Sequence, residues 1–315
     1  MIRVEHVCRR YGDLTAVDRV SLSIERGEIV GLLGHNGAGK TTLMQMLTGF
    51  IEPTSGTISV AGYDVQQQRL EAQRKIGYLP ETAPLYPEMT VQDYLLTMAD
   101  LRGVPAELRT QAVARAAAGT DLRGRMLQPI RTLSKGYRQR VGLAQAIVHE
   151  PDVLILDEPT NGLDPAQIVA IRKLVRSLGE RTTVLLSTHI LQEVEAVCER
   201  VLVMIDGALA LDAPLSELLT SRTLRLALGT EQDPSAVLTG LPGIRAVRSL
   251  GPEPGMVGFH AYALDCEPGD WPTDNVARTC ADQGWTLGAL APEQRTLDGV
   301  FRELQSKRAG GGHPS

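Results

Sequence analysis

Residues 34–42 read Gly34-His35-Asn36-Gly37-Ala38-Gly39-Lys40-Thr41-Thr42. The apolar segment 28–33 before them is typical of a buried strand, and Leu43–Leu47 after them has apolar residues at helical spacing. A strand, a glycine-rich loop and a helix in this order are the context of a phosphate-binding loop. The glycines let backbone N–H groups surround an anion, and the new helix adds the positive end of its dipole. A glycine-rich turn with a chance lysine would not explain these flanking elements, so we predict binding of a nucleoside triphosphate.

Within this loop we expect Lys40 to reach the β- and γ-phosphates and the Thr41 hydroxyl to bind Mg²⁺. All nine residues, 34–42, are candidates for contacting the nucleotide.

Composition limits the class of protein. A chain of 315 residues with 43% hydrophobic content suggests one large and one small domain with a real core. The net charge of −5 argues against nucleic-acid binding, for which a basic stripe would be expected. No apolar run approaches the roughly 18 residues of a membrane-spanning helix, and the first residues resemble an edge strand more than a signal peptide. Four scattered cysteines, with no C-x-x-C pair, indicate a reduced cytoplasmic chain.

The order of predicted elements indicates an α/β domain over residues 1–220 with a helical insertion. Residues 90–148 are almost wholly helical in pattern, which predicts an inserted subdomain at about 84–150. Strand character returns afterwards, in four segments: 153–156, 182–186, 200–205 and 208–211. A helix at 165–178 starts with proline, which is favoured at that position.

Residues 221–308 have a different organisation and predict a small α+β domain. The expected order is strand, helix, strand, strand, helix, strand, which is that of the split ferredoxin-like unit. The corresponding ranges are 224–228, 234–238, 244–250, 257–264, 273–283 and 285–290. A last helix, 297–305, precedes a tail, 309–315, that we expect to be disordered.

Two further strand ends carry polar residues suited to phosphate chemistry. Asp157 and Glu158 follow the buried strand 153–156, where a carboxylate beside a phosphate loop can hold Mg²⁺. We assign Asp157 to the metal and Glu158 to the attacking water as general base, although acids that merely end a strand are the alternative. His189 follows the strand 182–186 and is expected to hydrogen-bond the γ-phosphate, its alternative being a structural histidine.

A second helix start could also face an anion. Ser134 is a predicted N-cap, and Gly136 would allow close backbone approach. Alone this signal is weak, because many helices begin with serine.

Six motifs in a fixed order make the chain resemble the ATP-binding subunit of an ABC transporter. They are the phosphate loop, Pro80-Glu81, Leu133-Ser134-Lys135-Gly136, Asp157-Glu158-Pro159, Asn161-Gly162-Leu163-Asp164 and Ser187-Thr188-His189. The resemblance covers residues 1–220 and implies a P-loop ATPase fold. It also implies that two subunits meet head to tail, with each ATP between one phosphate loop and the other subunit's signature helix.

The resemblance also implies roles for individual residues. Ser134 and Gly136 would contact the γ-phosphate bound by the partner, and Asp164 would lie in the loop that links the two sites. Tyr11 matches the aromatic residue that stacks on adenine, with a packed core tyrosine as the alternative.

Two departures from the family pattern are informative. Glu81 stands where the family usually has a glutamine that touches the metal, so Glu81 is a candidate Mg²⁺ ligand, the alternative being a solvated loop residue that transmits motion toward the permease. Lys135 and Tyr137 replace the third and fifth residues of the usual signature Leu-Ser-Gly-Gly-Gln. Both departures resemble the subgroup that serves separate-chain exporter permeases, as does the ending Leu297–Leu304. The apolar loop 83–89 resembles the region where a permease docks, although it could be an ordinary packed loop.

The resemblance therefore implies an ATP-binding and hydrolysing subunit that powers a membrane exporter through ATP-dependent dimerisation, with ATP and Mg²⁺ as its cofactors. We expect a homodimer, integral membrane permease partners and a place on the inner, cytoplasmic face of the membrane. The alternative is a soluble ABC ATPase that acts on ribosomes or DNA. Such chains usually have two cassettes or long coiled coils, whereas this one has a single phosphate loop and no sustained heptads. The C-terminal unit could sense a small molecule or stabilise the dimer.

Overall fold

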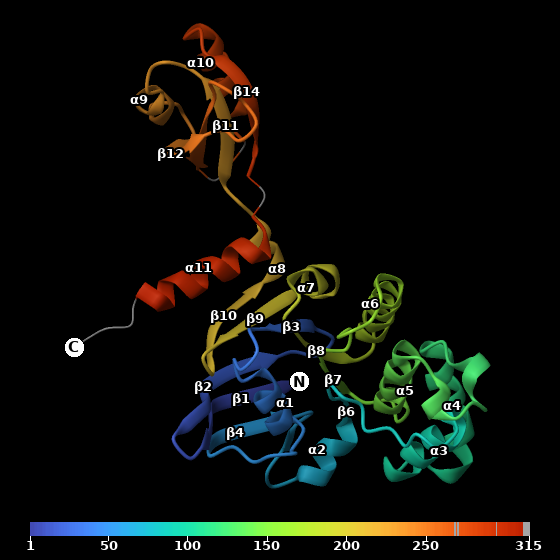
Figure 1. Ribbon diagram of the computed structural model, residues 1–315. Coiled ribbons are helices and arrows are strands. Elements are labelled where there is room, and N and C mark those ends of the chain that lie inside the picture. The colour runs from blue at the N-terminus through green and yellow to red at the C-terminus, as the bar shows by residue number, and fades with distance from the viewer. Residues whose placement is uncertain (268, 270, 294, 311–315) are drawn as a thin grey trace. The chain divides into compact units, whose positions relative to one another are not determined.

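The computed structural model describes residues 1–267, 269, 271–293 and 295–310. The chain divides into two compact units, which Figure 1 colours from the N-terminus to the C-terminus. The first comprises Met1–Leu215 together with the described residues from Phe301 onward, and the second is Ser216–Val300.

Two sheets form the framework of the first unit. The antiparallel sheet has the order β2-β1-β4-β5 and the larger sheet the order β10-β9-β3-β8-β7-β6. Neighbouring strands of the larger sheet are parallel except for the β9–β10 pair. The antiparallel sheet comprises β1 (Ile2–Tyr11), β2 (Leu14–Ile24), β4 (Ser55–Val60) and β5 (Tyr63–Asp64). The larger sheet comprises β3 (Ile29–Leu33), β6 (Ile76–Leu79), β7 (Val153–Asp157), β8 (Thr183–Thr188), β9 (Arg200–Ile205) and β10 (Ala208–Pro214).

Three of the parallel strands are buried along their whole length. Every residue of β3, β7 and β8 is buried, as expected for a parallel sheet covered on both faces. Helix α1 (Lys40–Leu47) joins this core through Leu43, Met44 and Leu47, each fully buried. The glycine loop is thus held between a buried strand and a buried helix.

The remaining helices of this unit include the predicted helical block. Helices α3 (Val91–Leu101), α4 (Ala106–Gly119) and α5 (Lys135–Ile147) fall within residues 84–150 and share a core cluster of their own. Two 3₁₀ turns, Arg123–Arg125 and Ile130–Thr132, lie between α4 and α5. The other helices are α2 (Arg69–Lys75), α6 (Pro165–Gly179) and α7 (Leu191–Val197).

The second unit has the predicted βαββαβ order. Its strands pair only antiparallel, in the order β12-β13-β11-β14, and its leucine-rich core includes Leu224, Leu226 and Leu264. The elements are β11 (Thr223–Gly229), α9 (Ser235–Thr239), β12 (Ile244–Pro252), β13 (His260–Cys266), α10 (Thr273–Asp282) and β14 (Thr286–Pro292). A short helix, α8 (Leu215–Leu219), precedes them.

The third strand of this unit was placed wrongly from the sequence. Strand β13 begins at His260 and not at Val257. Gly255 and Gly258 have positive φ angles of 82° and 84°, which suit turns, and the Val257 side chain is fully exposed. The apolar character of Val257 therefore reflects no strand pairing.

The C-terminal helix and the division between the units also differ from the predicted ranges. Helix α11 is Leu297–Gly310, so Ala309 and Gly310 of the predicted disordered tail are helical, while 311–315 lie outside the described residues. The first unit extends to Leu215, whereas the predicted boundary was near residue 220. Leu215 is buried and its N–H donates to the Glu199 carbonyl at 2.8 Å, which anchors it in the first unit.

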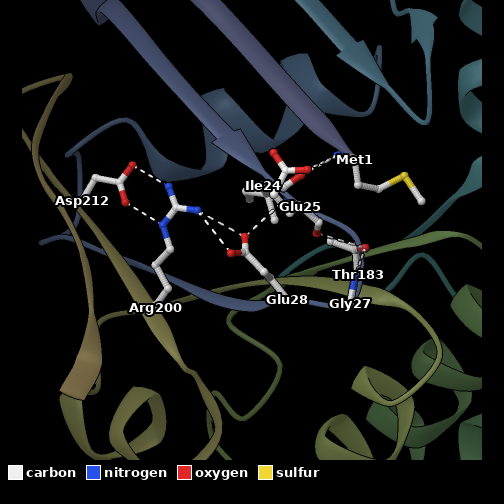
Figure 2. A network of polar contacts seen from close by, with 8 residues as sticks. All are labelled: Met1, Ile24, Glu25, Gly27, Glu28, Thr183, Arg200 and Asp212. Atoms are coloured by element: carbon white, nitrogen blue, oxygen red, sulfur yellow. Dashed lines mark hydrogen bonds and ion pairs between the residues drawn. The ribbon is translucent and has the colours of Figure 1, made fainter. Parts of the chain in front are cut away.

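An ionic network lies at the amino ends of the central strands (Figure 2). Arg200, the first residue of β9, donates from Nε and Nη2 to the two carboxylate oxygens of Asp212 at 2.7 and 2.8 Å. Its Nη1 donates to Glu28 Oε2 at 3.2 Å, and this oxygen also accepts the Glu25 N–H at 3.0 Å. Arg200 therefore neutralises two carboxylates that belong to different parts of the sheet.

We expect Arg200→Met to lower the free energy of unfolding by about 2 kcal/mol, because two half-buried carboxylates would lose their cation. The guanidinium-bearing side chain is 21% exposed and its partners 30% each. Urea denaturation at pH 7 measures the loss. The matched control is Arg19→Met, whose arginine is 76% exposed beside Asp18, and it should show no measurable change. A variant at Arg200 as stable as wild type would show that the network contributes nothing.

A partly buried histidine after α5 predicts a pH dependence of stability. His149 Nε2 lies 3.2 Å from the Ile76 carbonyl oxygen. Burial, and secondly the nearby Arg102 charge, lower the pKa of His149 to about 4 from an ordinary value of 6.5. The folded protein thus keeps His149 neutral while the unfolded chain takes up a proton below pH 6.5. The stabilisation is complete above this pH and is lost as the pH falls from 6.5 toward 4.

Between pH 7 and pH 5 this residue should cost about 2 kcal/mol of unfolding free energy. His149→Gln removes the titrating group but keeps a donor that can reach the Ile76 carbonyl. The difference in unfolding free energy between wild type and His149→Gln should therefore change by about 2 kcal/mol between pH 7 and pH 5. Urea denaturation of both proteins at the two pH values measures this change. Equal losses in both proteins would exclude His149 as the cause.

Candidate functional site

The predicted site residues meet at one edge of the larger sheet. In the parallel register Leu33 lies opposite Thr188, and Asp157 lies opposite Ser187. Because the carboxyl ends of parallel strands share an edge, the loops that follow β3, β6, β7 and β8 converge there. The phosphate loop, Glu81, Asp157 with Glu158, and His189 belong to these four loops.

The glycines of the phosphate loop are required by close packing. Gly39 has a φ of 98°, and a Cβ there would collide with the Ala16 carbonyl oxygen. A Cβ on Gly34 would lie 2.6 Å from the Met204 carbonyl oxygen. Among the described residues no side chain caps α1, which begins at Lys40, so its first N–H groups suit an anion.

Lys40 is nearly buried between the loop and the acidic residues. Its side chain is 6% exposed, and Nζ donates to the carbonyl oxygens of Gly34 at 2.7 Å and His35 at 3.2 Å. Glu158 Oε1 lies 3.9 Å from the same nitrogen. Burial lowers the pKa of Lys40, while the charges of Glu158, Asp157 and Glu81 oppose this effect. The ammonium group therefore faces the end of the sheet at which the acids lie.

Asp157 has one oxygen available for a ligand. The residue is 1% exposed, and the Ser187 hydroxyl donates to Oδ1. Within the described part of the chain, the buried Oδ2 has no hydrogen-bond partner. An unpaired buried carboxylate oxygen is costly, and a hard cation would satisfy it. Asp157 thus fits the predicted metal role.

Glu158 and His189 form a pair. Glu158 Oε2 lies 2.9 Å from His189 Nδ1, and the Glu158 N–H donates to the Ser187 carbonyl at 3.1 Å. Glu158 has a φ of 49°, in the left-handed region that costs a non-glycine residue about 1 kcal/mol and is frequent at functional sites. The Glu158 side chain is 9% exposed and that of His189 45%. A nearly buried carboxylate is therefore held by a histidine that faces outward.

The other predicted metal ligands, Glu81 and Thr41, are exposed at the same edge. Glu81 Oε1 accepts a hydrogen bond from Asn161 Nδ2 at 3.0 Å. No cluster of three or more His, Cys, Asp or Glu suited to a metal occurs among the described residues. The predicted set has two carboxylates and a hydroxyl, which leaves the other positions to phosphate oxygens and water, as Mg²⁺ commonly requires.

The roles expected for Tyr11, Ser134 and Gly136 come from the family resemblance. Tyr11 ends β1 and is 44% exposed, with the Arg9 guanidinium 4.5 Å from its ring centroid, so it is no packed core tyrosine. Ser134 is exposed and caps α5 as predicted, accepting from the Tyr137 N–H at 3.4 Å.

For Gly136 the structure shows a further constraint. A Cβ there would collide with the Gln167 side-chain amide, which also completes the capping box of α6 with Asp164. Gly136 is therefore needed for packing within the subunit, apart from any anion.

Sequence reasoning gave no individual role to several polar residues of the site, although Asn161 and Ser187 stand in the ordered motifs. Ser187 holds Asp157, and Asn161 holds Glu81. Behind them Glu193 of α7 accepts hydrogen bonds from the hydroxyls of Thr160 and Thr188. The helical spacing of Leu191, Val194 and Val197 could have indicated α7, but its polar contacts join segments far apart in sequence.

Comparison with known proteins agrees with this geometry. A family model described as ABC transporter matches residues 17–161. The Nod factor export ATP-binding protein I of Burkholderia orbicola is 39% identical over 207 residues, 65% of this chain and 68% of that protein. The bacitracin transport ATP-binding protein BcrA of Bacillus licheniformis is 36% identical over 220 residues, 69% of this chain and 71% of that protein.

The chain belongs to the ABC transporter ATP-binding proteins. A bacterial ABC transporter cassette solved as a dimer superposes with a TM-score of 0.63 at 25% identity, covering 68% of this chain and 99% of that one. The P-loop ATPase fold and the family expected from the ordered motifs are thus confirmed. In the described part of this ABC ATPase, no helix is long and apolar enough to cross a membrane.

Proposed function

We propose that this ABC ATPase binds and hydrolyses Mg-ATP in order to power a membrane exporter. The observation that carries the proposal is the position of the Glu158 carboxylate. It lies 2.9 Å from His189 Nδ1 and 3.9 Å from Lys40 Nζ, at the sheet edge that bears the phosphate loop. A base, a hydrogen-bonding histidine and a fixed cation at one phosphate site are what hydrolysis of a phosphoanhydride needs.

The residues of the site divide the reaction between them. The N–H groups of the loop and Lys40 Nζ hold the phosphates in place. Glu158 takes the proton of the water that attacks the γ-phosphorus, as the bond between that phosphorus and the β-phosphate bridging oxygen breaks. His189 orients Glu158 and donates to the γ-phosphate.

Asp157, Thr41 and Glu81 would hold Mg²⁺, which supplies positive charge to the phosphate oxygens. The unpaired Oδ2 of Asp157 is the support for this assignment. Tyr11 would stack on adenine, its exposed ring suiting that role.

We further propose a dimer in which Ser134 and Gly136 of one copy contact the nucleotide of the other. The exposed start of α5 and the dimeric form of the superposable cassette support this arrangement. The names of the relatives, bacitracin transport and Nod factor export, support a transport role more than one on ribosomes or DNA. The partners would be integral membrane permease subunits that dock near loop 83–89, with the protein on the inner face of the membrane. The second unit would stabilise the dimer or bind a regulatory ligand.

The test is the dependence of turnover on protein concentration. If two copies complete each site, ATP hydrolysis per molecule should rise with protein concentration and then level off as dimers form. Turnover per molecule that does not change while the protein stays monomeric would overturn the sandwich. Co-purification in detergent with an integral membrane protein from the native cell tests the permease partner, and co-purification with ribosomes or DNA instead would favour the soluble role.

The replacement Glu81→Gln tests the proposed metal ligand. Glutamine keeps an oxygen but removes one negative charge near the γ-phosphate. We expect ATP to bind more tightly without Mg²⁺, and added Mg²⁺ to improve affinity less than in wild type. Unit charges some 4 Å apart interact by roughly 4 kcal/mol at an effective dielectric of 20, so a screened remnant of about tenfold in Kd is measurable. Nucleotide titrations with and without Mg²⁺ measure this change in Kd. An identical effect of Mg²⁺ on both proteins would show that Glu81 is not a metal ligand.

A further inference from the structure

One buried carboxylate has no role in the proposed reaction. Glu193 lies on α7 and is 1% exposed. Its Oε1 accepts the hydroxyl of Thr160, and its Oε2 accepts the hydroxyl of Thr188 at 2.9 Å. Acidic residues are almost never fully buried unless they are paired, and here both partners are neutral hydroxyls. Such an arrangement needs an explanation beyond charge neutralisation.

The two threonines belong to the two segments that carry the catalytic pair. Thr160 follows Glu158 by two residues and is 4% exposed, and Thr188 immediately precedes His189 and is fully buried. The Thr188 hydroxyl also accepts the Ile190 N–H at 3.0 Å, so its proton is directed at Glu193. Glu193 therefore joins the loop after β7 to the end of β8 from behind the site.

Helix α7 gives Glu193 a fixed position. The next residue, Val194, is fully buried, and a Cβ on Gly31 of β3 would lie only 2.8 Å from Val194 Cγ1. This close approach packs α7 against the strand that leads into the phosphate loop. Shifts of the carboxylate relative to that loop are thereby restricted.

We infer that Glu193 is a positioning residue, which sets the geometry of the Glu158–His189 pair through Thr160 and Thr188; this inference rests on the proposed hydrolysis. Only a group that accepts on both sides suits two hydroxyl donors. A glutamine would present an N–H₂ group to one of them, so that hydroxyl would have to reverse its hydrogen bond and accept, and both contacts would lose the charge of the carboxylate. The two segments would then be held less firmly next to the catalytic pair.

Glu193→Gln is therefore expected to lower kcat about tenfold to a hundredfold, the usual effect of a displacement of about 1 Å at a catalytic group. The KM for ATP should stay within about twofold, because the phosphate loop is attached to β3 and α1. The matched control is Glu195→Gln, which makes the same charge change at an exposed position of α7 and should leave kcat unchanged. A merely structural role would lower stability without this split between kcat and KM.

The hydroxyls supply the second test. Thr188→Ser and Thr160→Ser keep the donors and should retain kcat, whereas Thr188→Val and Thr160→Val should lower it. When Thr160 and Thr188 are both replaced by valine, adding Glu193→Gln should lower kcat little further, because the three groups act as one unit. Fully additive losses of kcat from the Glu193 and threonine replacements would overturn the inference. Serine variants whose kcat is as low as that of the valine variants would overturn it too.

A readout that does not depend on hydrolysis separates this inference from the proposed function. The ring ¹⁵N chemical shifts of His189, assigned by His189→Gln, should move in Glu193→Gln and stay in place in Glu195→Gln. Unchanged shifts in Glu193→Gln would refute the positioning role. Wild-type protein that hydrolyses no ATP would instead refute the proposed function, while the shifts would still decide whether Glu193 positions the pair.

Discussion

Glu158→Gln is expected to lower the rate of ATP hydrolysis by about 10³-fold while ATP still binds, because a positioned general base contributes roughly 10² to 10⁴. Glutamine has nearly the same shape as the glutamate but cannot accept the proton of the attacking water. Lys40 and the loop N–H groups, which hold the phosphates in our proposal, are unchanged. The loss should therefore appear in kcat and not in the affinity for nucleotide.

The same variant should accumulate as an ATP-bound dimer, since hydrolysis is the step that lets the dimer open. Size-exclusion chromatography with Mg-ATP would show the dimer, and single-turnover assays would show the slow chemistry. Glu71→Gln, an exposed acid on α2, is the control and should behave as wild type. A Glu158 variant that binds ATP and yet stays monomeric would contradict the sandwich arrangement.

Lys40→Ala is expected to reduce kcat/KM for ATP by about 10²- to 10³-fold, comparable to the removal of a preorganised donor from a transition state. The ammonium group acts as a point charge on the phosphates, and no neutral residue can replace it. The fold should remain intact, because among the described residues Nζ contacts only carbonyl oxygens of its own loop and the neighbouring Glu158.

Thermal unfolding followed by circular dichroism checks that Lys40→Ala is folded, and a coupled phosphate assay measures its turnover. Lys173→Ala removes an exposed lysine of α6 and serves as the matched control. Near-normal turnover of the Lys40 variant would refute the assignment of the loop.

Sequence reasoning succeeded where the information is local. The strand, glycine loop and helix at 28–47 were predicted because spacing and residue type alone specify them. Ser134 as an N-cap and the proline start of α6 follow from the same kind of local preference. The convergence of Asp157, Glu158 and His189 also followed, because the ends of parallel strands meet at one edge.

Other features could not be predicted, because they depend on side chains that meet across elements. Val257 has the apolar character of a strand residue, yet two glycine turns keep it out of β13. Gly136 suggested an anion site from its sequence, whereas packing against Gln167 already requires a glycine there. Residue type in each case allowed more than one environment.

The sequence by itself thus determined the family, the order of the motifs and the identity of the catalytic candidates, since these depend on residue type and spacing along the chain. Tertiary packing determined the partners of those candidates. Glu193 lies 33 residues from Thr160, and Asn161 lies 80 residues from Glu81. The register of β7 and β8 and the close contact of α7 with Gly31 bring such groups together, and neither is encoded in a local pattern. Hydrogen bonds between distant segments exist only once the sheet and its helices have packed.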